Sequence, residues 1–267
     1  MDREEKSLRA QLRQAGISSR AIDAAWPNWW RDELADSASG RAELRFALAR
    51  KLGMSPKGLL GQRVEFVWDD SAKFKHLKAE DEGDRAALTA FGLAVGRILI
   101  NATKEGGSLV GFDAQILRQE LLRTGSAFVD LELLLSLCWS VGIPVIHLRV
   151  FPLEAKKMHA MVVSIGNRFA ILLGKDANYP APVAFTLAHE LGHIVSGHLD
   201  GAPLLVDLQD PAFAKEPDEQ EKEADGFALE LLTGRVDPQI TTSLQTFNAP
   251  TLAEAVKLAA SQYQVEP

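Results

Sequence analysis

The chain has 267 residues, of which 46% are hydrophobic and 24% charged, proportions typical of a globular protein that buries a substantial core. Its single cysteine, Cys138, excludes an internal disulfide and every zinc site built from several cysteines, so a metal would depend on His and carboxylate ligands. Residues 1–80 hold 15 Lys/Arg against 12 Asp/Glu and the remainder 14 against 24, which makes the C-terminal part a poor binder of nucleic acid.

The first residues, MDREEKSLRAQLRQ, have no apolar stretch behind their charges and are not typical of a signal peptide. The most apolar stretches further along are interrupted by charges or glycine before they reach the length that crosses a bilayer. A lone cysteine suits a reducing compartment. We therefore expect a cytoplasmic protein that does not enter a membrane.

The N-terminal quarter of the chain is predicted to be helical throughout. Short helices are expected over 3–15 and 18–35, with breaks at Gly16 and Pro27. Another helix is expected over 41–52, because apolar residues recur there at helical spacing and a glycine follows.

The segment 47–55, ALARKLGMS, resembles the first helix and turn of a helix-turn-helix. Ser55 and Pro56 then open another helix, as an N-cap followed by proline at the first helical position. That helix is short and carries two glycines, which is unfavourable for a recognition helix. We therefore expect an all-α module over residues 1–65 that docks the following domain or its partner, with weak nucleic-acid binding through residues 1–80 as the alternative.

A second domain is predicted over residues 66–267, and in it three helices precede a group of strands. The turn Gly166-Asn167 between two strands is typical of a two-residue hairpin. The expected helices are 85–104, 113–123, 130–141, 183–198 and 218–233 with two short ones after 237, and the expected strands are 143–150, 159–165 and 168–173, with a loop or short strand over 199–216. This order indicates an α+β fold in which a small twisted sheet packs on the helix 183–198.

The sequence His189-Glu190-Leu191-Gly192-His193 carries the chemistry of this domain. On a helix, positions i and i+4 project from the same face, so the two imidazoles can bind one ion. Glu190 lies about 100° round the helix from His189, away from the ligand position and beside a water on that ion. Zinc lowers the pKa of such a water, and a neighbouring carboxylate can take its proton and pass it to a leaving amine. The pattern predicts a zinc site with Glu190 as the general base.

A catalytic zinc takes three protein ligands and leaves a fourth position open. The helix expected over 218–233 supplies Glu221, Glu223 and Asp225. Glu221 and Asp225 share one helix face, so Glu221 is predicted as the third ligand and Asp225 as the carboxylate that accepts the second ring N–H of a zinc-bound histidine. Glu223 is the alternative third ligand.

The motif HELGH, followed downstream by EKEADGFALELL, resembles the ImmA/IrrE family of bacterial metallopeptidases. The upstream order GIPVIHL, MHAMV, a strand and FTLAHELGH is similar too. The resemblance implies a zincin-like domain of the gluzincin type with one zinc per chain, bound by His189, His193 and Glu221, with Glu190 as the base. It also implies site-specific cleavage of a partner helix-turn-helix repressor that controls stress or mobile-element genes.

Other residues are weaker candidates for the same site. His159 and Tyr179 could stabilise the oxyanion of the tetrahedral intermediate as donors near the cleft. His198 lies five residues after His193, which misses the six-residue spacing of a third histidine ligand and favours a residue at the helix end. Cys138 is interpreted as a buried helix residue, with a thiolate that caps the zinc as the alternative.

The sequence thus favours hydrolysis of one peptide bond in a specific protein. The substrate is expected to extend along an edge strand of the sheet, for which we choose the strand 168–173. Two hypotheses from other classes stay open: a DNA-binding regulator, and a regulator that sequesters a repressor, each with a zincin fold that does not turn over. The first predicts salt-sensitive duplex binding by residues 1–80, and the second predicts a stable complex without a cut product.

Overall fold

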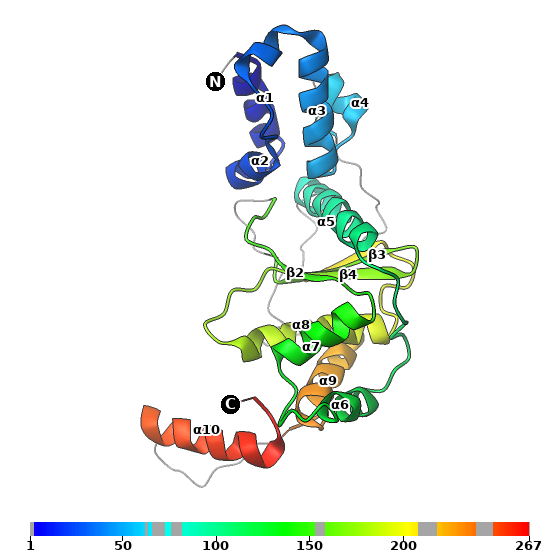
Figure 1. Ribbon diagram of the computed structural model, residues 1–267, viewed down its shortest axis with the longest axis vertical. Coiled ribbons are helices and arrows are strands. Elements are labelled where there is room, and N and C mark those ends of the chain that lie inside the picture. The colour runs from blue at the N-terminus through cyan, green and yellow to red at the C-terminus, as the bar shows by residue number, and fades with distance from the viewer. Residues whose placement is uncertain are drawn as a thin grey trace.

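The computed structural model describes residues 3–61, 64–65, 73–75, 82–152, 158–207, 218–238 and 248–266. This part of the chain is an elongated α+β fold, with the N-terminal helices at one end, the sheet in the middle and the C-terminal helix at the other end (Figure 1). In chain order the elements are α1 (Arg3–Gln14), α2 (Ser19–Ala25), η1 (Asp32–Asp36), α3 (Ala38–Leu52), α4 (Pro56–Leu60), β1 (Lys73–Lys75), α5 (Glu82–Ala102), α6 (Ala114–Leu122), α7 (Leu131–Ser140), β2 (Val145–His147), β3 (Ala160–Ile165), β4 (Arg168–Leu173), α8 (Pro180–Val195), β5 (Leu204–Asp207), α9 (Glu219–Thr233) and α10 (Ala249–Tyr263).

Capping residues set the limits of the N-terminal helices. The Ser18 hydroxyl accepts a hydrogen bond from Ala21 N at 3.1 Å and starts α2. Ser37 starts α3 in the same way, through Gly40 N at 2.9 Å. Gly53 ends α3 with a φ of 69°, a left-handed conformation that favours glycine. The all-α character predicted for this region is confirmed.

The N-terminal helices enclose an apolar core of their own, to which α5 also contributes. The largest fully buried side chains of this core are those of Leu8, Leu12, Ile22, Leu44, Leu48, Leu59 and Leu88. Leu88 belongs to α5, whose later turns pack on the sheet, so the N-terminal helices and the sheet share one helix. The domain boundary expected between residues 65 and 66 stays a prediction, because residues 62–63 and 66–72 lie outside the described residues.

The sheet has five strands among the described residues, in the order β1-β5-β3-β4-β2. β3 is antiparallel to both of its neighbours, whereas β1 and β2 run parallel to β5 and β4 respectively. β3 and β4 are joined at Gly166 and Asn167, whose φ values of 57° and 62° belong to a type I′ turn. The hairpin predicted from these two residues is confirmed.

Alternating residues divide the sheet between two helix layers (Figure 1). Met161 and Val163 pack with residues of α5 on one face, whereas Val162 and Ile171 pack with residues of α7 and α8 on the other. Gly96 allows α5 to come close, since an added Cβ there would lie 2.5 Å from Val163 Cγ1. α5 therefore covers one face of the sheet, and α8 packs on the opposite face.

Within the described residues, α5 is the one helix long and apolar enough to cross a membrane, with a mean hydropathy of 1.2 over Arg85–Ala102. No stretch of this length and hydropathy was expected from the sequence. Half of this window is buried, between the sheet and the N-terminal core. This is the position of a core helix, and packing on two partners explains its apolar composition.

Two further expectations are wrong. The strand 168–173, β4, lies between β3 and β2 and is not an edge, because the edges of the described sheet are β1 and β2. The helix expected from residue 183 begins at Pro180 and contains Pro182, since proline fits the first turn of a helix without loss of a hydrogen bond. Of the two short helices expected after residue 237, the structure describes one longer helix, α10, and residues 239–247 lie outside the described part.

Candidate metal centre

α8 carries the HELGH motif in a helix whose second half is buried all round. Every side chain from Thr186 to Val195 is buried, because the sheet, α7 and α9 surround this part of the helix. His189, Glu190 and His193 therefore lie in the interior, where polar groups need hydrogen-bond partners or an ion. The burial of these side chains agrees with a binding site in the interior and excludes two histidines on the surface of the helix.

α9 crosses α8 where the side chains are shortest. An added Cβ on Gly192 would lie 2.9 Å from Ala224 Cα and 3.0 Å from Ala224 O, closer than van der Waals contact allows. The glycine of the motif thus permits the two backbones to approach. Asp218 caps α9 by accepting a hydrogen bond from Glu221 N at 2.9 Å, which places Glu221 in the first turn. The Glu221 side chain points toward α8 and is only 3% exposed.

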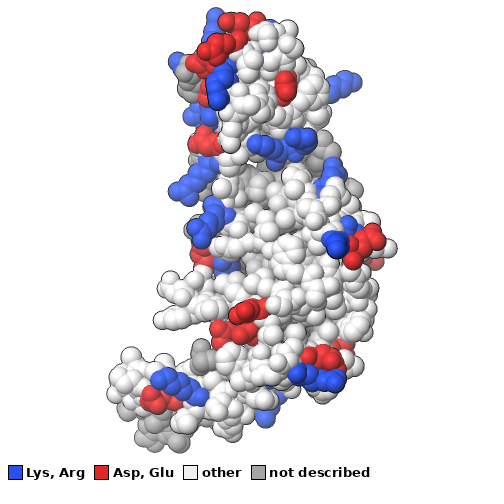
Figure 2. Space-filling model, in the orientation of Figure 1, with Lys and Arg blue, Asp and Glu red and all other residues white. Residues whose placement is uncertain are grey.

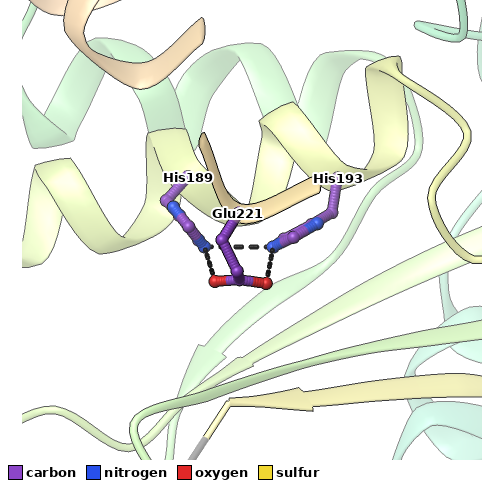
Figure 3. A group of neighbouring side chains, drawn as sticks. All are labelled: His189, His193 and Glu221. Atoms are coloured by element: carbon purple, nitrogen blue, oxygen red, sulfur yellow. Dashed lines mark hydrogen bonds and ion pairs between the residues drawn. The ribbon is translucent and has the colours of Figure 1, made fainter. Parts of the chain in front are cut away.

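The two histidines and Glu221 point toward one small space (Figure 3). The Nε2 atoms of His189 and His193 are 3.0 Å apart. His189 Nε2 is 3.4 Å from Glu221 Oε2, and His193 Nε2 is 3.5 Å from Glu221 Oε1. Ligand atoms about 2.1 Å from a tetrahedral zinc lie about 3.4 Å from one another. The donor set therefore fits zinc in chemistry and in spacing, and it is the group among the described residues that could hold a metal.

Asp225 contacts the outer nitrogen of His189, with 2.9 Å between Nδ1 and Oδ1. With a metal on the lone pair of Nε2, Nδ1 would carry the hydrogen and donate it to the carboxylate. The structure thus brings together the pair that the sequence predicts. Glu190 is fully buried next to His189 in the chain but is not part of the three-donor group, which agrees with a base and not a ligand.

His193 also has an outer hydrogen-bond partner, which was not predicted from the sequence. α8 ends just before Gly197, whose φ of 71° turns the chain back, and His198 N donates to His193 O at 2.9 Å. The His198 ring lies with Nδ1 2.9 Å from His193 Nδ1 and Nε2 3.1 Å from Glu223 Oε2. The hydrogen bond from His198 holds the pKa of Glu223 below its ordinary value. The available signal was Gly197, since a glycine after a helix commonly returns the next residue onto the last turn.

Other predicted residues do not join the three donors. Tyr179, at the start of α8, is 75% exposed. His159 is half-buried just before β3, and its carbonyl accepts a hydrogen bond from Gly174 N at 2.8 Å. Cys138 is buried in the core beside α8, and burial raises the pKa of its thiol to about 12. Cys138 is therefore a core residue, and the oxyanion roles of His159 and Tyr179 stay predictions.

Comparison with known proteins adds an independent observation. The model of a peptidase family, described as the IrrE N-terminal-like domain, matches residues 142–256. The matched segment begins just before β2 and contains the hairpin, α8 and α9. No curated protein and no solved structure matched the chain.

Proposed function

We propose that the protein is a zinc-dependent endopeptidase, and the match of residues 142–256 to the IrrE N-terminal-like domain, which agrees with the resemblance to the ImmA/IrrE family, supports this proposal. The observation that carries the proposal is the convergence of His189, His193 and Glu221, whose ligand atoms lie within 4.8 Å of one another. Three protein ligands leave one position of a four-coordinate zinc for water or substrate, which is the arrangement of a catalytic site and not of a structural one.

The residues around the donors suit peptide hydrolysis. Zinc bound there would polarise a peptide carbonyl and lower the pKa of a water molecule toward neutrality. Glu190 would accept the proton of the attacking water and pass it to the leaving amine. Asp225 holds His189 in the tautomer that leaves Nε2 for the metal.

We propose that the substrate is a partner protein, a helix-turn-helix repressor that is cut at one site in the cytoplasm, so that cleavage releases stress or mobile-element genes. The resemblance to the ImmA/IrrE family supports this choice. Since β4 is internal, the edge strand β2 becomes the candidate for pairing with an extended substrate. A cavity of about 510 Å³ lies beside β2, with Leu135, Trp139 and Lys175 among its lining residues.

The substitution Glu190→Gln tests the proposal. Glutamine keeps the shape of the side chain but cannot act as the base, so the variant should keep one zinc per chain while cleavage of a co-expressed repressor falls at least about 100-fold. Glu219→Gln, at a glutamate of α9 whose side chain is 90% exposed, is the matched control and should cleave as the wild type does. Undiminished cleavage by Glu190→Gln would show that the base is assigned wrongly.

The two non-enzymatic hypotheses give different results in the same assay. A sequestering regulator would hold the repressor in a stable, uncut complex with the wild-type chain. A DNA-binding regulator would bind duplex through the N-terminal helices, but α4, the helix that follows the turn, has only five residues, which leaves few side chains to contact base edges. Acidic side chains are also interspersed with basic ones over these helices (Figure 2), which weakens attraction to phosphates.

A further inference from the structure

A second polar chain reaches the metal centre through His193, and the mechanism above does not use it. His193 is fully buried and His198 is 5% exposed, whereas the Glu223 side chain at the far end is 62% exposed. The contacts along the chain are 2.9 Å between the Nδ1 atoms of the two histidines and 3.1 Å between His198 Nε2 and Glu223 Oε2. The chain thus links a buried ligand to a carboxylate at the surface.

These contacts fix the hydrogens on both rings. Because His193 offers Nε2 to the metal, its hydrogen is on Nδ1 and is donated to His198 Nδ1. His198 therefore accepts at Nδ1 and carries its own hydrogen on Nε2, where it donates to the Glu223 carboxylate. One arrangement of hydrogens satisfies all three side chains.

The backbone places His198 for this contact. His198 N donates to His193 O at 2.9 Å and Gly197 N donates to Ile194 O at 3.2 Å, which together form a Schellman helix end. In a Schellman motif the residue at C″ commonly makes an apolar contact with the residue at C3. Here His198 occupies C″ and His193 occupies C3. An imidazole at this position turns the usual apolar contact into a hydrogen bond to a metal ligand.

We propose that His198 and Glu223 are positioning residues that orient His193 and strengthen it as a zinc ligand, as Asp225 does for His189. The inference rests on the proposed zinc site. It separates the functions of two acidic residues on α9, since Glu221 binds the metal and Glu223 acts through His198. It also assigns the histidine that follows the HELGH helix, although that residue lies outside the three-donor group.

The test is the zinc affinity of the full chain, measured by competition with a chelator, together with the absorption spectrum of the Co²⁺-substituted protein. His198→Ala should weaken zinc binding about 10- to 100-fold and change the Co²⁺ spectrum. His198→Gln should recover most of the affinity, because its amide can accept from His193 and donate to Glu223. This rescue distinguishes a hydrogen-bonding role from simple packing.

The same measurement tests Glu223, which lies at the surface end of the hydrogen-bonded series of side chains. Glu223→Ala should weaken zinc binding by a smaller factor, about threefold to tenfold, because the carboxylate acts through His198. Glu219→Ala, at an exposed glutamate of the same helix, should bind zinc as the wild type does. Circular dichroism shows whether each variant folds. Because the Glu223 side chain is exposed, Glu223→Ala should fold and so tests the inference even if His198→Ala does not fold.

The double variant His198→Ala/Glu223→Ala distinguishes a connected chain from two independent effects. In a connected chain it binds zinc no more weakly than His198→Ala alone. Wild-type affinity in both His198→Ala and Glu223→Ala, or additive losses in the double variant, would overturn the inference. A wild-type chain that retains no zinc would overturn the proposed function itself.

Discussion

The N-terminal core and the crossing of α8 and α9 are both buried contacts between helices, but opposite kinds of side chain build them. Large apolar residues such as Leu44 and Leu48, each 0% exposed, fill the N-terminal core. α8 and α9 meet at Gly192 and Ala224, and the side chains that could hold a metal, those of His189, His193 and Glu221, converge on one space. Stability needs bulk between the helices, whereas a metal site needs two backbones close enough for ligands on both helices to meet. Substitutions in the N-terminal core should therefore change mainly stability, whereas substitutions at the contact of α8 and α9 should change mainly metal binding.

The largest expected effect concerns Cys138, which reports how tightly the core behind α8 is closed. Burial raises the pKa of its thiol from 9.0 to about 12, so at pH 8 the reactive thiolate should be about 1000-fold rarer in the folded chain than in the unfolded one. Because only the unfolded chain forms thiolate between pH 9 and 12, the free energy of unfolding should fall as the pH rises through that window. Thiol labelling of native and denatured protein measures the first effect, and comparable rates would show that this core is open.

Gly192→Val should separate α8 from α9 and remove Glu221 from the histidines. The added side chain meets the backbone of Ala224, which cannot give way as a flexible side chain can. We expect zinc affinity to fall more than about 100-fold, beyond the loss that follows from removing an outer hydrogen-bond partner. Gly226→Ala is the control, because its Cβ would meet only a Val236 methyl at 3.3 Å. Equal zinc affinity in the Gly192 variant and the wild type would show that the close approach of α8 and α9 is not needed for metal binding.

Leu48→Ala should affect stability and leave the metal site unchanged. Leu48 is fully buried in the N-terminal core, so the cavity should reduce the free energy of unfolding by about 2–4 kcal/mol. Phe46→Ala, on the same helix but 49% exposed, should cost much less. Urea denaturation measures both values. A loss of zinc affinity in folded Leu48→Ala would show that the N-terminal core helps to hold the ligands in place.

Asp225→Ala should give the smallest of these changes, a roughly tenfold loss of zinc affinity. The reason is that His189 loses the acceptor of its Nδ1 hydrogen but keeps its place on α8. Asp225→Asn should fall between this variant and the wild type, because the amide oxygen can still accept. Chelator competition ranks the three proteins, and equal affinities would show that the contact has no effect on the metal.

Local patterns in the sequence predict much of the fold and of the site. The spacing of HELGH predicts that His189 and His193 share a face, and Glu221 follows from the need for a third ligand on the next helix. Gly166-Asn167 predicts its turn because both residues tolerate positive φ. The shared face of the two histidines and the turn depend only on residues close together in the chain, whereas Glu221 follows from the number of ligands that a catalytic zinc takes.

Long-range arrangement accounts for what the sequence could not predict. β4 was predicted to be an edge strand only because it directly precedes α8 in the chain. In the structure β2, which comes earlier in the chain, pairs with the side of β4 that faces away from β3. The sequence near α5 does not explain why this helix is so apolar. The explanation is that α5 packs against two cores that other parts of the chain form. The contact of His198 with Glu223 joins two helix ends that the sequence separates, so spacing from His193 alone suggested a residue without a role.

Anomalous diffraction at the zinc absorption edge, from crystals of the zinc-loaded chain, would locate the metal and so decide whether His189, His193 and Glu221 bind it. We expect one strong peak per chain, about 2.1 Å from the Nε2 atoms of His189 and His193 and from a carboxylate oxygen of Glu221. A peak at any other place, or a bound zinc with Glu221 turned away from both histidines, would contradict it.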